Sequence, residues 1–143
     1  MLITDPGKRL VAMHLYDNLL KVVDTRGGRF ADLALNVRLE EMGVIDVAFL
    51  HDAVESGASS ASSQPAAGGA FAGGHPVLAL LHEDADGGKH VSTYIVNIDE
   101  ASLSPGPWRV ALGPADIDAH ALIPVPGTRA GVIVAGGNGF RYK

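Results

Sequence analysis

The sequence contains no cysteine among its 143 residues. This absence excludes disulfide bonds, thiolate metal sites and a cysteine nucleophile, and it is typical of intracellular proteins. Apolar runs as long as a membrane-spanning helix are also missing. No basic segment followed by an apolar stretch marks a secretory signal. The sequence therefore predicts no contact with a membrane.

Basic charge is scarce as well. Lysine and arginine number 11 against 16 aspartates and glutamates, which gives a formal net charge of −5. The basic residues are scattered, and no cluster is denser than Arg26 and Arg29. Nucleic-acid surfaces need clustered cations, because neutralising phosphates supplies most of their affinity. We therefore expect this segment to make no direct contact with nucleic acid.

Helical periodicity is absent too, apart from one helical turn that residues 38–42 could form. Turn signals such as Asp17-Asn18, Gly27-Gly28 and Ser104-Pro105-Gly106-Pro107 recur at short intervals, as in proteins built of short strands. Ten strands are predicted, and an all-β fold with them. They cover residues 10–16, 19–25, 32–38, 45–52, 76–83, 90–98, 108–112, 119–125, 131–135 and 140–142.

The predicted strands over residues 10–16 and 90–98 are apolar on both faces, whereas a strand in a half-solvated sheet alternates apolar and polar residues. Stacked β-propeller blades would give this pattern. A covered parallel sheet would also give it, but the connections are too short for crossover helices. The strands up to Leu50 form one four-stranded meander in this interpretation. The predicted fold is about two and a half antiparallel four-stranded blades of a β-propeller.

The amino-acid sequence of several segments resembles that of the family of the large subunit of the UV-damaged-DNA-binding complex. The matching segments occur in the family's order over nearly the whole chain. The sequence departs clearly from the family only in the Ala/Ser/Gly tract over residues 53–74. Large propeller subunits of splicing and polyadenylation factors are similar at greater distance. The matching segments include Leu15-Tyr16-Asp17, Arg38-Leu39-Glu40-Glu41, Val44-Ile45-Asp46-Val47, His90-Val91-Ser92-Thr93-Tyr94, Gly106-Pro107-Trp108 and Ile123-Pro124-Val125-Pro126.

The resemblance implies a protein-interaction scaffold from the first of three propellers. Members of that family are adaptors of cullin-RING ubiquitin ligases in the DNA-damage response, so the implied partners are a cullin and substrate-receptor subunits. The implied location is the nucleus and also the cytoplasm, with any DNA contact in a partner subunit. The alternative is a scaffold of a pre-mRNA splicing or 3′-end-processing complex. The family motifs mark no partner-binding residues in this chain.

Ten strands are too few for a closed propeller, and Met1 to Pro6 correspond to an internal connection of the family. We therefore expect a fragment of the N-terminal propeller over residues 1–143, or alternatively a small autonomous β-domain. The low-complexity tract predicts a disordered loop over residues 54–74 between two strands of one blade. Early proteolysis is expected within residues 56–74, and Phe71 is a less favoured partner contact.

The sequence shows no set of residues with the spacing of a known catalytic motif. His51, Asp52 and His82 could approach across a hairpin as metal ligands, but solvated strand-end residues are the favoured interpretation. The run Gly136-Gly137-Asn138-Gly139 follows a strand without the lysine and helix of a phosphate loop, so a hairpin turn is predicted. The sequence thus predicts no enzyme, no cofactor and no metal.

Five further residues have structural interpretations. Adjacent Glu40 and Glu41 should point to opposite sides of an extended chain, while Arg38 could pair with Glu40. Asp46 lies among apolar residues, where an unpaired carboxylate is costly, so it should accept amides from a turn or a neighbouring strand. Trp108 is predicted to anchor an outer strand, with a contact role as the alternative.

Overall fold

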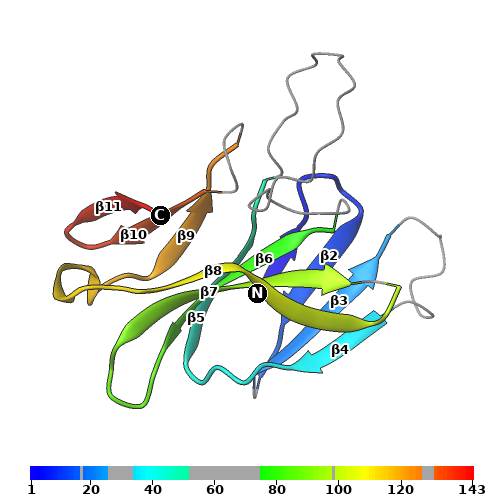
Figure 1. The fold of residues 1–143 in the computed structure, drawn as a ribbon, viewed down its shortest axis with the longest axis horizontal. Coiled ribbons are helices and arrows are strands. Elements are labelled where there is room, and N and C mark those ends of the chain that lie inside the picture. Colours follow the sequence, from blue (N-terminus) through cyan, green and yellow to red (C-terminus); the bar gives the residue numbers. More distant parts are fainter. Residues whose placement is uncertain (17, 26–33, 52–74, 98, 127–130) are drawn as a thin grey trace, which may run out of the picture.

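The computed structural model describes residues 1–16, 18–25, 34–51, 75–97, 99–126 and 131–143. These residues form three antiparallel sheets and one short 3-10 turn, η1 (Pro114–Asp116), with no α-helix among them (Figure 1). The first sheet has the order β1 (Leu2–Thr4), β2 (Leu10–His14), β3 (Leu19–Asp24) and β4 (Ala34–Arg38). The second has the order β5 (Val44–Phe49), β6 (Val77–Glu83), β7 (Lys89–Asn97) and β8 (Ser102–Ala111). The third has the order β11 (Gly139–Tyr142), β10 (Val132–Gly136) and β9 (Ala121–Pro124). The all-β, partial-propeller prediction is confirmed.

The second sheet lies between the other two and is buried on both faces. Along β6, Leu78 and Leu80 enter a core shared with the first sheet, whereas Ala79 and Leu81 enter a core shared with the third. All four are 0 % exposed. Alternate side chains of a strand point to opposite faces, so one apolar strand supplies both cores. Two cores of this kind hold the three sheets as stacked layers.

The prediction of two apolar faces is confirmed for β7. Tyr94 and Val96 pack on the first core, and Val91 and Ile95 pack on the second. The same prediction is only half right for residues 10–16. On one face Leu10 and Ala12 are buried, whereas Val11 and Met13 on the other face are only partly buried, and the strand ends at His14. The reason is that the first sheet packs against another described sheet on one side only.

Two strand assignments need correction. β1, which was interpreted as an internal connection, pairs with β2 through Leu2 opposite Met13. The segment over residues 44–49 does not complete the first blade, because β5 pairs with β6 and opens the second sheet. The first four-stranded sheet is therefore β1 to β4, and the described residues hold eleven strands rather than ten.

The predicted turn at Ser104-Pro105-Gly106-Pro107 is wrong, because these residues lie inside β8. The pairing of β7 with β8 shifts between Ser92 and Tyr94, so that residues 106–108 bulge opposite Thr93. A bulge accommodates prolines that a regular central strand would exclude. Residues 38–42 form no helical turn and instead bend from β4 into β5.

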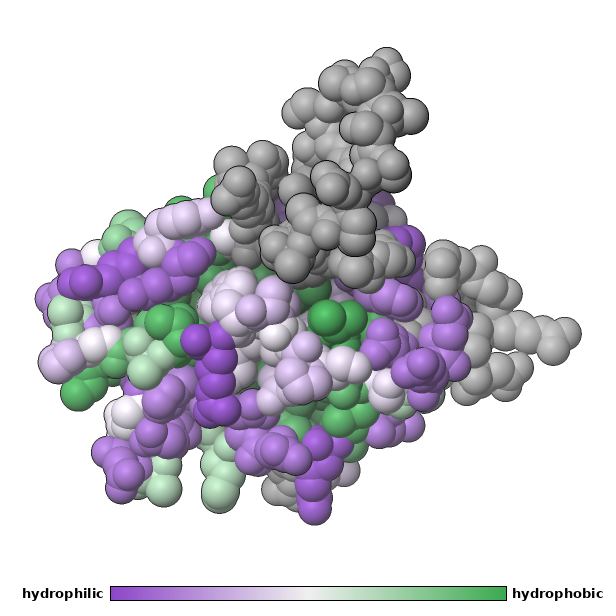
Figure 2. Space-filling model, viewed as in Figure 1, coloured by the Kyte–Doolittle hydropathy of each residue, from purple (hydrophilic) through white to green (hydrophobic). Residues whose placement is uncertain are grey.

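The low-complexity tract connects β5 to β6, two paired strands of the second sheet. The predicted disorder over residues 54–74 and the contact role of Phe71 lie outside the described residues. In the part of the chain that the structure describes, no helix has the length and apolarity needed to span a membrane. On the face shown in Figure 2, hydrophobic residues reach the surface as separate areas among hydrophilic ones.

A candidate partner-binding groove between the first two sheets

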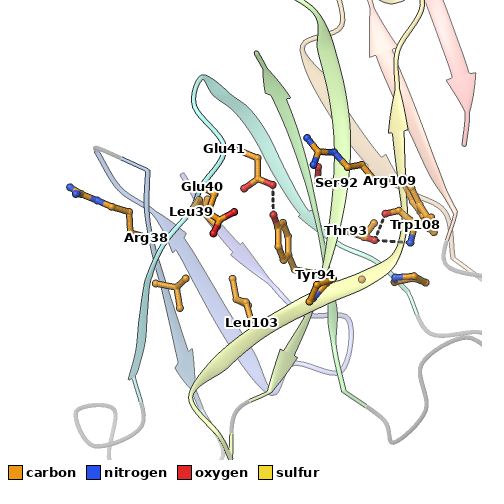
Figure 3. Close-up of a pocket in the computed structure, with 14 residues that line it drawn as sticks. Arg38, Leu39, Glu40, Glu41, Ser92, Thr93, Tyr94, Leu103, Trp108 and Arg109 are labelled. Carbon is orange, nitrogen blue, oxygen red and sulfur yellow. Dashed lines mark hydrogen bonds between the residues drawn. The ribbon is translucent and has the colours of Figure 1, made fainter. Parts of the chain in front are cut away.

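A cavity of about 610 Å³ opens where the first and second sheets meet (Figure 3). One wall comes from the end of β4 and the connection to β5, residues 37–41. The other comes from residues 92–94 of β7 and from residues 103 and 105–109 of β8. The cavity therefore lies at a boundary between two stacked layers, where side chains from distant parts of the sequence meet.

The β4–β5 connection places two glutamates in the cavity wall, one exposed and one buried. The Leu39 amide donates to the carbonyl of Asn18 at 2.8 Å, and the Leu39 side chain is buried in the first core. Gly43 closes the bend with a φ of 64°, a conformation that side-chain-bearing residues rarely adopt. Between them, Glu40 is exposed and Glu41 is only 8 % exposed. The two glutamates differ in exposure, but both line the same cavity, so the prediction that they point to opposite sides is not confirmed.

The predicted ion pair between Arg38 and Glu40 is wrong. Both side chains are described and exposed, yet they do not come within ion-pair distance of each other. Arg38 is the last residue of β4, and Glu40 lies beyond it in the bend. Residues two apart share a face only while the strand continues.

Only one of the two oxygens of the Glu41 carboxylate has a hydrogen-bond partner. The Tyr94 hydroxyl donates a hydrogen bond to Oε1, and Figure 3 shows the carboxylate directed toward the Tyr94 ring. Oε2 is buried without any hydrogen-bond partner. Burial, followed by the hydrogen bond to Glu41, raises the pKa of Tyr94 far above its usual value, so the hydroxyl keeps its proton and remains a donor. An unsatisfied buried oxygen of this kind costs about 1–3 kcal/mol or more when it carries charge.

A second cavity of about 320 Å³ adjoins the first. The two cavities share Glu40, Glu41 and Arg109 in their walls, and we call them together the seam groove. The charged side chains that line the seam groove are four carboxylates and two guanidinium groups. They are Glu40, Glu41, Glu83 and Asp84, with Arg38 and Arg109. The groove thus has an excess of negative charge.

Polar pairs lie beside the seam groove. His82 Nε2 is 3.0 Å from Ser92 Oγ, and His90 Nε2 is 2.7 Å from Asp84 Oδ2. The rings of His82 and His90 stack with centroids 5.4 Å apart. Burial lowers the pKa of His82, which favours the neutral imidazole. Ser92 and His82 are each 3 % exposed.

The β8 bulge forms the far wall of the seam groove. Thr93 Oγ1 donates to the carbonyl of Trp108 and accepts from its amide, which fixes the bulge against β7. A Cβ on Gly106 would approach Thr93 Oγ1 at 2.3 Å, so only glycine fits there. Trp108 packs partly against the second core from the outermost strand of its sheet, as predicted for an anchor.

The structural role predicted for Asp46 is confirmed. Asp46 Oδ1 accepts the amide of Val47 at 2.9 Å, and Oδ2 accepts the amide of Leu122 in β9 at 2.7 Å. The carboxylate therefore ties the second sheet to the third. Both oxygens of the Asp46 carboxylate accept backbone amides, so the group has a structural role.

The alternative metal site is wrong. His82 pairs with Val44 at the start of β5, whereas His51 follows the end of β5, so the two histidines lie at opposite ends of the hairpin. Asp52 lies outside the described residues. Within the residues that the structure describes, no group of three or more histidine, aspartate or glutamate side chains could hold a metal ion.

The predicted hairpin at the C-terminal glycine run is confirmed. Gly136 pairs with Gly139 across β10 and β11, which leaves Gly137 and Asn138 as a two-residue turn. Asn138 Nδ2 donates to Asp118 Oδ2 at 3.1 Å and so holds the turn against the preceding loop. The glycines serve the backbone here, as the sequence indicates.

Sequence reasoning missed the contacts that build the seam groove. Glu41 and Tyr94 are 53 positions apart, and His82 and Ser92 are diagonal neighbours on paired strands. A single sequence carries no signal for the first pair. The second could have been found from the register of the β6–β7 hairpin, which places Leu80 opposite Ser92.

Comparison with known proteins gives consistent matches. A family model described as the RSE1/DDB1/CPSF1 first beta-propeller matches residues 1–143. The chain is 34% identical over 134 residues to DNA damage-binding protein 1a and 32% identical to DNA damage-binding protein 1b, both of Arabidopsis thaliana. It is also 34% identical to DNA damage-binding protein 1 of Oryza sativa subsp. japonica. Each match covers 94% of this chain and 10% of the relative, so the chain spans about a tenth of the length of these relatives.

Proposed function

The chain belongs to the RSE1/DDB1/CPSF1 first β-propeller family, a family of propeller scaffolds, and from this membership we propose that it forms part of the substrate-receptor-binding adaptor of a cullin-RING ubiquitin ligase. Its partners in this function are a cullin and substrate-receptor proteins. The names of the relatives support a role in the DNA-damage response and a place in the nucleus, with the cytoplasm as a second location.

The observation that carries the proposal is the burial of the second sheet on both faces. Leu80 lies in one core and Leu81 in the other, both at 0 % exposure, so the three sheets form stacked layers. Layers packed at the density of protein interiors deform little. A scaffold of this kind acts by position, because holding two partners on one body raises their effective concentration for each other.

The arrangement of polar residues supports a scaffold without its own chemistry. The described serine–histidine pair, Ser92 and His82, is buried, and the carboxylate of Asp46 is occupied by two amides. The net charge of −5 supports a body that does not contact nucleic acid itself. In this proposal, contact with damaged DNA is made by a partner subunit.

Affinity capture tests the proposal. The tagged 143-residue chain is expressed in cells of its source organism, and captured proteins are identified by mass spectrometry. Enrichment of a cullin together with receptor subunits supports the adaptor. The control is Leu80→Asp, which places a charge in the first core and should abolish capture. A chain that is folded but enriches neither class of partner contradicts the proposal.

A second function is favoured by the family description, which groups RSE1 and CPSF1 with DDB1. Under this alternative the chain is a scaffold of a splicing or 3′-end-processing complex. The same capture experiment separates the two functions. Enrichment of spliceosomal or cleavage-complex subunits without a cullin supports the alternative.

A further inference from the structure

We propose that the seam groove binds an extended basic segment of a partner protein, with a lysine or arginine side chain of that segment directed at Glu41. The inference rests on the proposed scaffold function and names the chemistry of one partner contact. It is carried by three independent features of the groove: an unsatisfied anion, an excess of acidic side chains, and walls suited to an extended chain.

The unsatisfied anion is the Glu41 carboxylate. The residue is 8 % exposed, and only Oε1 has a hydrogen-bond partner, the Tyr94 hydroxyl. A buried carboxylate with a free oxygen is destabilising, because water is lost without a replacement donor. A cationic donor in the cavity supplies that replacement. Hydrogen bonds between charged groups are roughly twice as strong as neutral ones, so the gain is largest for lysine or arginine.

The charge of the lining selects a cation over an anion. Exposed Glu40 lies beside Glu41, and the smaller cavity adds Glu83 and Asp84. Lys89 Nζ lies 3.9 Å from Glu83 and His90 Nε2 lies 2.7 Å from Asp84, so Glu40 and Glu41 carry the excess charge. The cations in the lining are Arg38 and Arg109, both exposed to water. Coulombic attraction is stronger at the poorly solvated floor than at the wetted rim. The buried anion therefore outweighs the two rim cations in its effect on a ligand side chain.

The walls suit the stem of a long side chain and an extended backbone. Leu103, Pro105 and Pro107 line the larger cavity, together with the ring of Tyr94. Lysine and arginine bury their methylenes against such surfaces while directing the charge to a polar group. The cavities of about 610 and 320 Å³ adjoin along the seam, which gives room for several residues of an extended segment.

Arg109 controls access to Glu41. Its exposed side chain lines both cavities, and its positive charge acts on both Tyr94 and His82. Oε2 of Glu41 is shielded by the groove walls, so an entering donor must displace a wall side chain. The exposed Arg109 is the cationic wall residue that can move aside. Arg109 forms no ion pair with Glu41 among the described residues, so in this proposal it opposes a ligand cation by charge repulsion across the shared wall.

Trp108 provides the readout. It is the single tryptophan of the chain and lines the larger cavity. The probe is an acetylated and amidated heptapeptide of alternating glycine and lysine, Gly-Lys-Gly-Lys-Gly-Lys-Gly, titrated into the 143-residue chain while tryptophan emission is recorded. Two comparison peptides replace every lysine with norleucine or with glutamate. The lysine peptide should give a saturable change, and the other two should give none.

Three variants locate the binding. Glu41→Gln keeps the size and the acceptor for Tyr94 but removes the charge, and it should weaken the lysine peptide at least tenfold. Glu100→Gln makes the same change of charge at an exposed turn away from the groove, and its affinity should stay within twofold of the original. Arg109→Ala removes the opposing cation and should strengthen binding at least threefold. An increase in affinity cannot arise from loss of the fold.

Three results would each overturn the inference. They are an affinity of the Glu41→Gln chain for the lysine peptide equal to that of the original chain, binding of the norleucine peptide by the original chain, and weaker binding of the lysine peptide by the Arg109→Ala chain. Far-UV circular dichroism checks that the variants are folded. If Glu41→Gln does not fold, the norleucine peptide and Arg109→Ala decide. Failure here is distinguishable from failure of the scaffold function. If the chain captures partners but does not bind the lysine peptide, only the groove inference is refuted. If it binds the peptide but captures no partners, the inference is supported and the scaffold function is contradicted.

Discussion

Replacing Asp46 with alanine should loosen the third sheet from the second. The carboxylate accepts the amide of Leu122 at 2.7 Å and that of Val47 at 2.9 Å. A hydrogen bond to a charged group contributes about 1.5–3 kcal/mol when buried. Asp46 is partly exposed, so water replaces some of what is lost. We expect Asp46→Ala to lower the free energy of unfolding by about 2–3 kcal/mol, and Asp46→Asn, which keeps one oxygen acceptor, by about half as much.

Urea denaturation and amide hydrogen exchange test this expectation together. With a urea dependence of about 1–3 kcal/mol per molar, the unfolding midpoint should fall by about 1–2 M for Asp46→Ala. Exchange of the Leu122 amide should become faster in the same variant, because that amide loses its acceptor. The control is Asp99→Ala, which removes a carboxylate from an exposed turn after β7.

Two results would refute this reasoning. The first is a midpoint for Asp46→Ala equal to that of Asp99→Ala. The second is unchanged exchange at Leu122, which would show that the amide is protected without the carboxylate. Either result would mean that the second and third sheets are held together by their apolar core alone.

Three further predictions follow from the same structure. Leu80→Ala, at a site with 0 % exposure in the first core, should cost about 2–5 kcal/mol in urea denaturation. Gly106→Ala should cost about 1–3 kcal/mol and change tryptophan emission, because its Cβ would meet Thr93 Oγ1 at 2.3 Å; Gly113→Ala, with nothing within 4 Å, should leave both unchanged. Burial lowers the pKa of His82, so the folded chain binds a proton at this site less readily than the unfolded chain, whose value is near 6.5. Its contribution to stability is therefore complete above pH 6.5 and is lost as the pH falls. Between pH 7 and 5 the original chain should lose more stability in urea denaturation than His82→Gln, and equal losses would contradict this assignment.

The strands could be predicted because burial on both faces leaves a direct trace in the sequence. The run of β6 is apolar at its first five positions, β7 carries apolar residues on both faces, and both strands belong to the doubly covered sheet. Which strand pairs with which was harder to predict. β1 has only three residues, too few to show an alternating pattern, and was missed although Ile3 packs against the first core. Without it, β5 was assigned to the wrong sheet.

The turn prediction at residues 104–107 was wrong because local turn propensity and tertiary hydrogen bonds favour different structures there. Pro105, Gly106 and Pro107 favour a turn by local propensity, but the hydrogen bonds of Thr93 to Trp108 hold them as a bulge within β8. Tertiary contacts decide such cases, and local sequence does not contain them. Asp46 shows the opposite situation. A carboxylate among apolar residues must find donors, so its role followed from the sequence even though Leu122 could not be named.

The pairing of β5 with β6 has a consequence for the order of folding. Both cores draw on this hairpin, yet residues 50–76 separate its strands, whereas residues 137 and 138 alone separate β10 from β11. Closing a connection of about 27 residues rather than 2 costs about 2 kcal/mol more chain entropy. The nucleus is therefore expected to form from the local hairpins β2–β3 and β6–β7, and β5 should join late. Because β5 joins after the nucleus, shortening the connection between Phe49 and Val77 should slow unfolding while leaving the folding rate nearly the same.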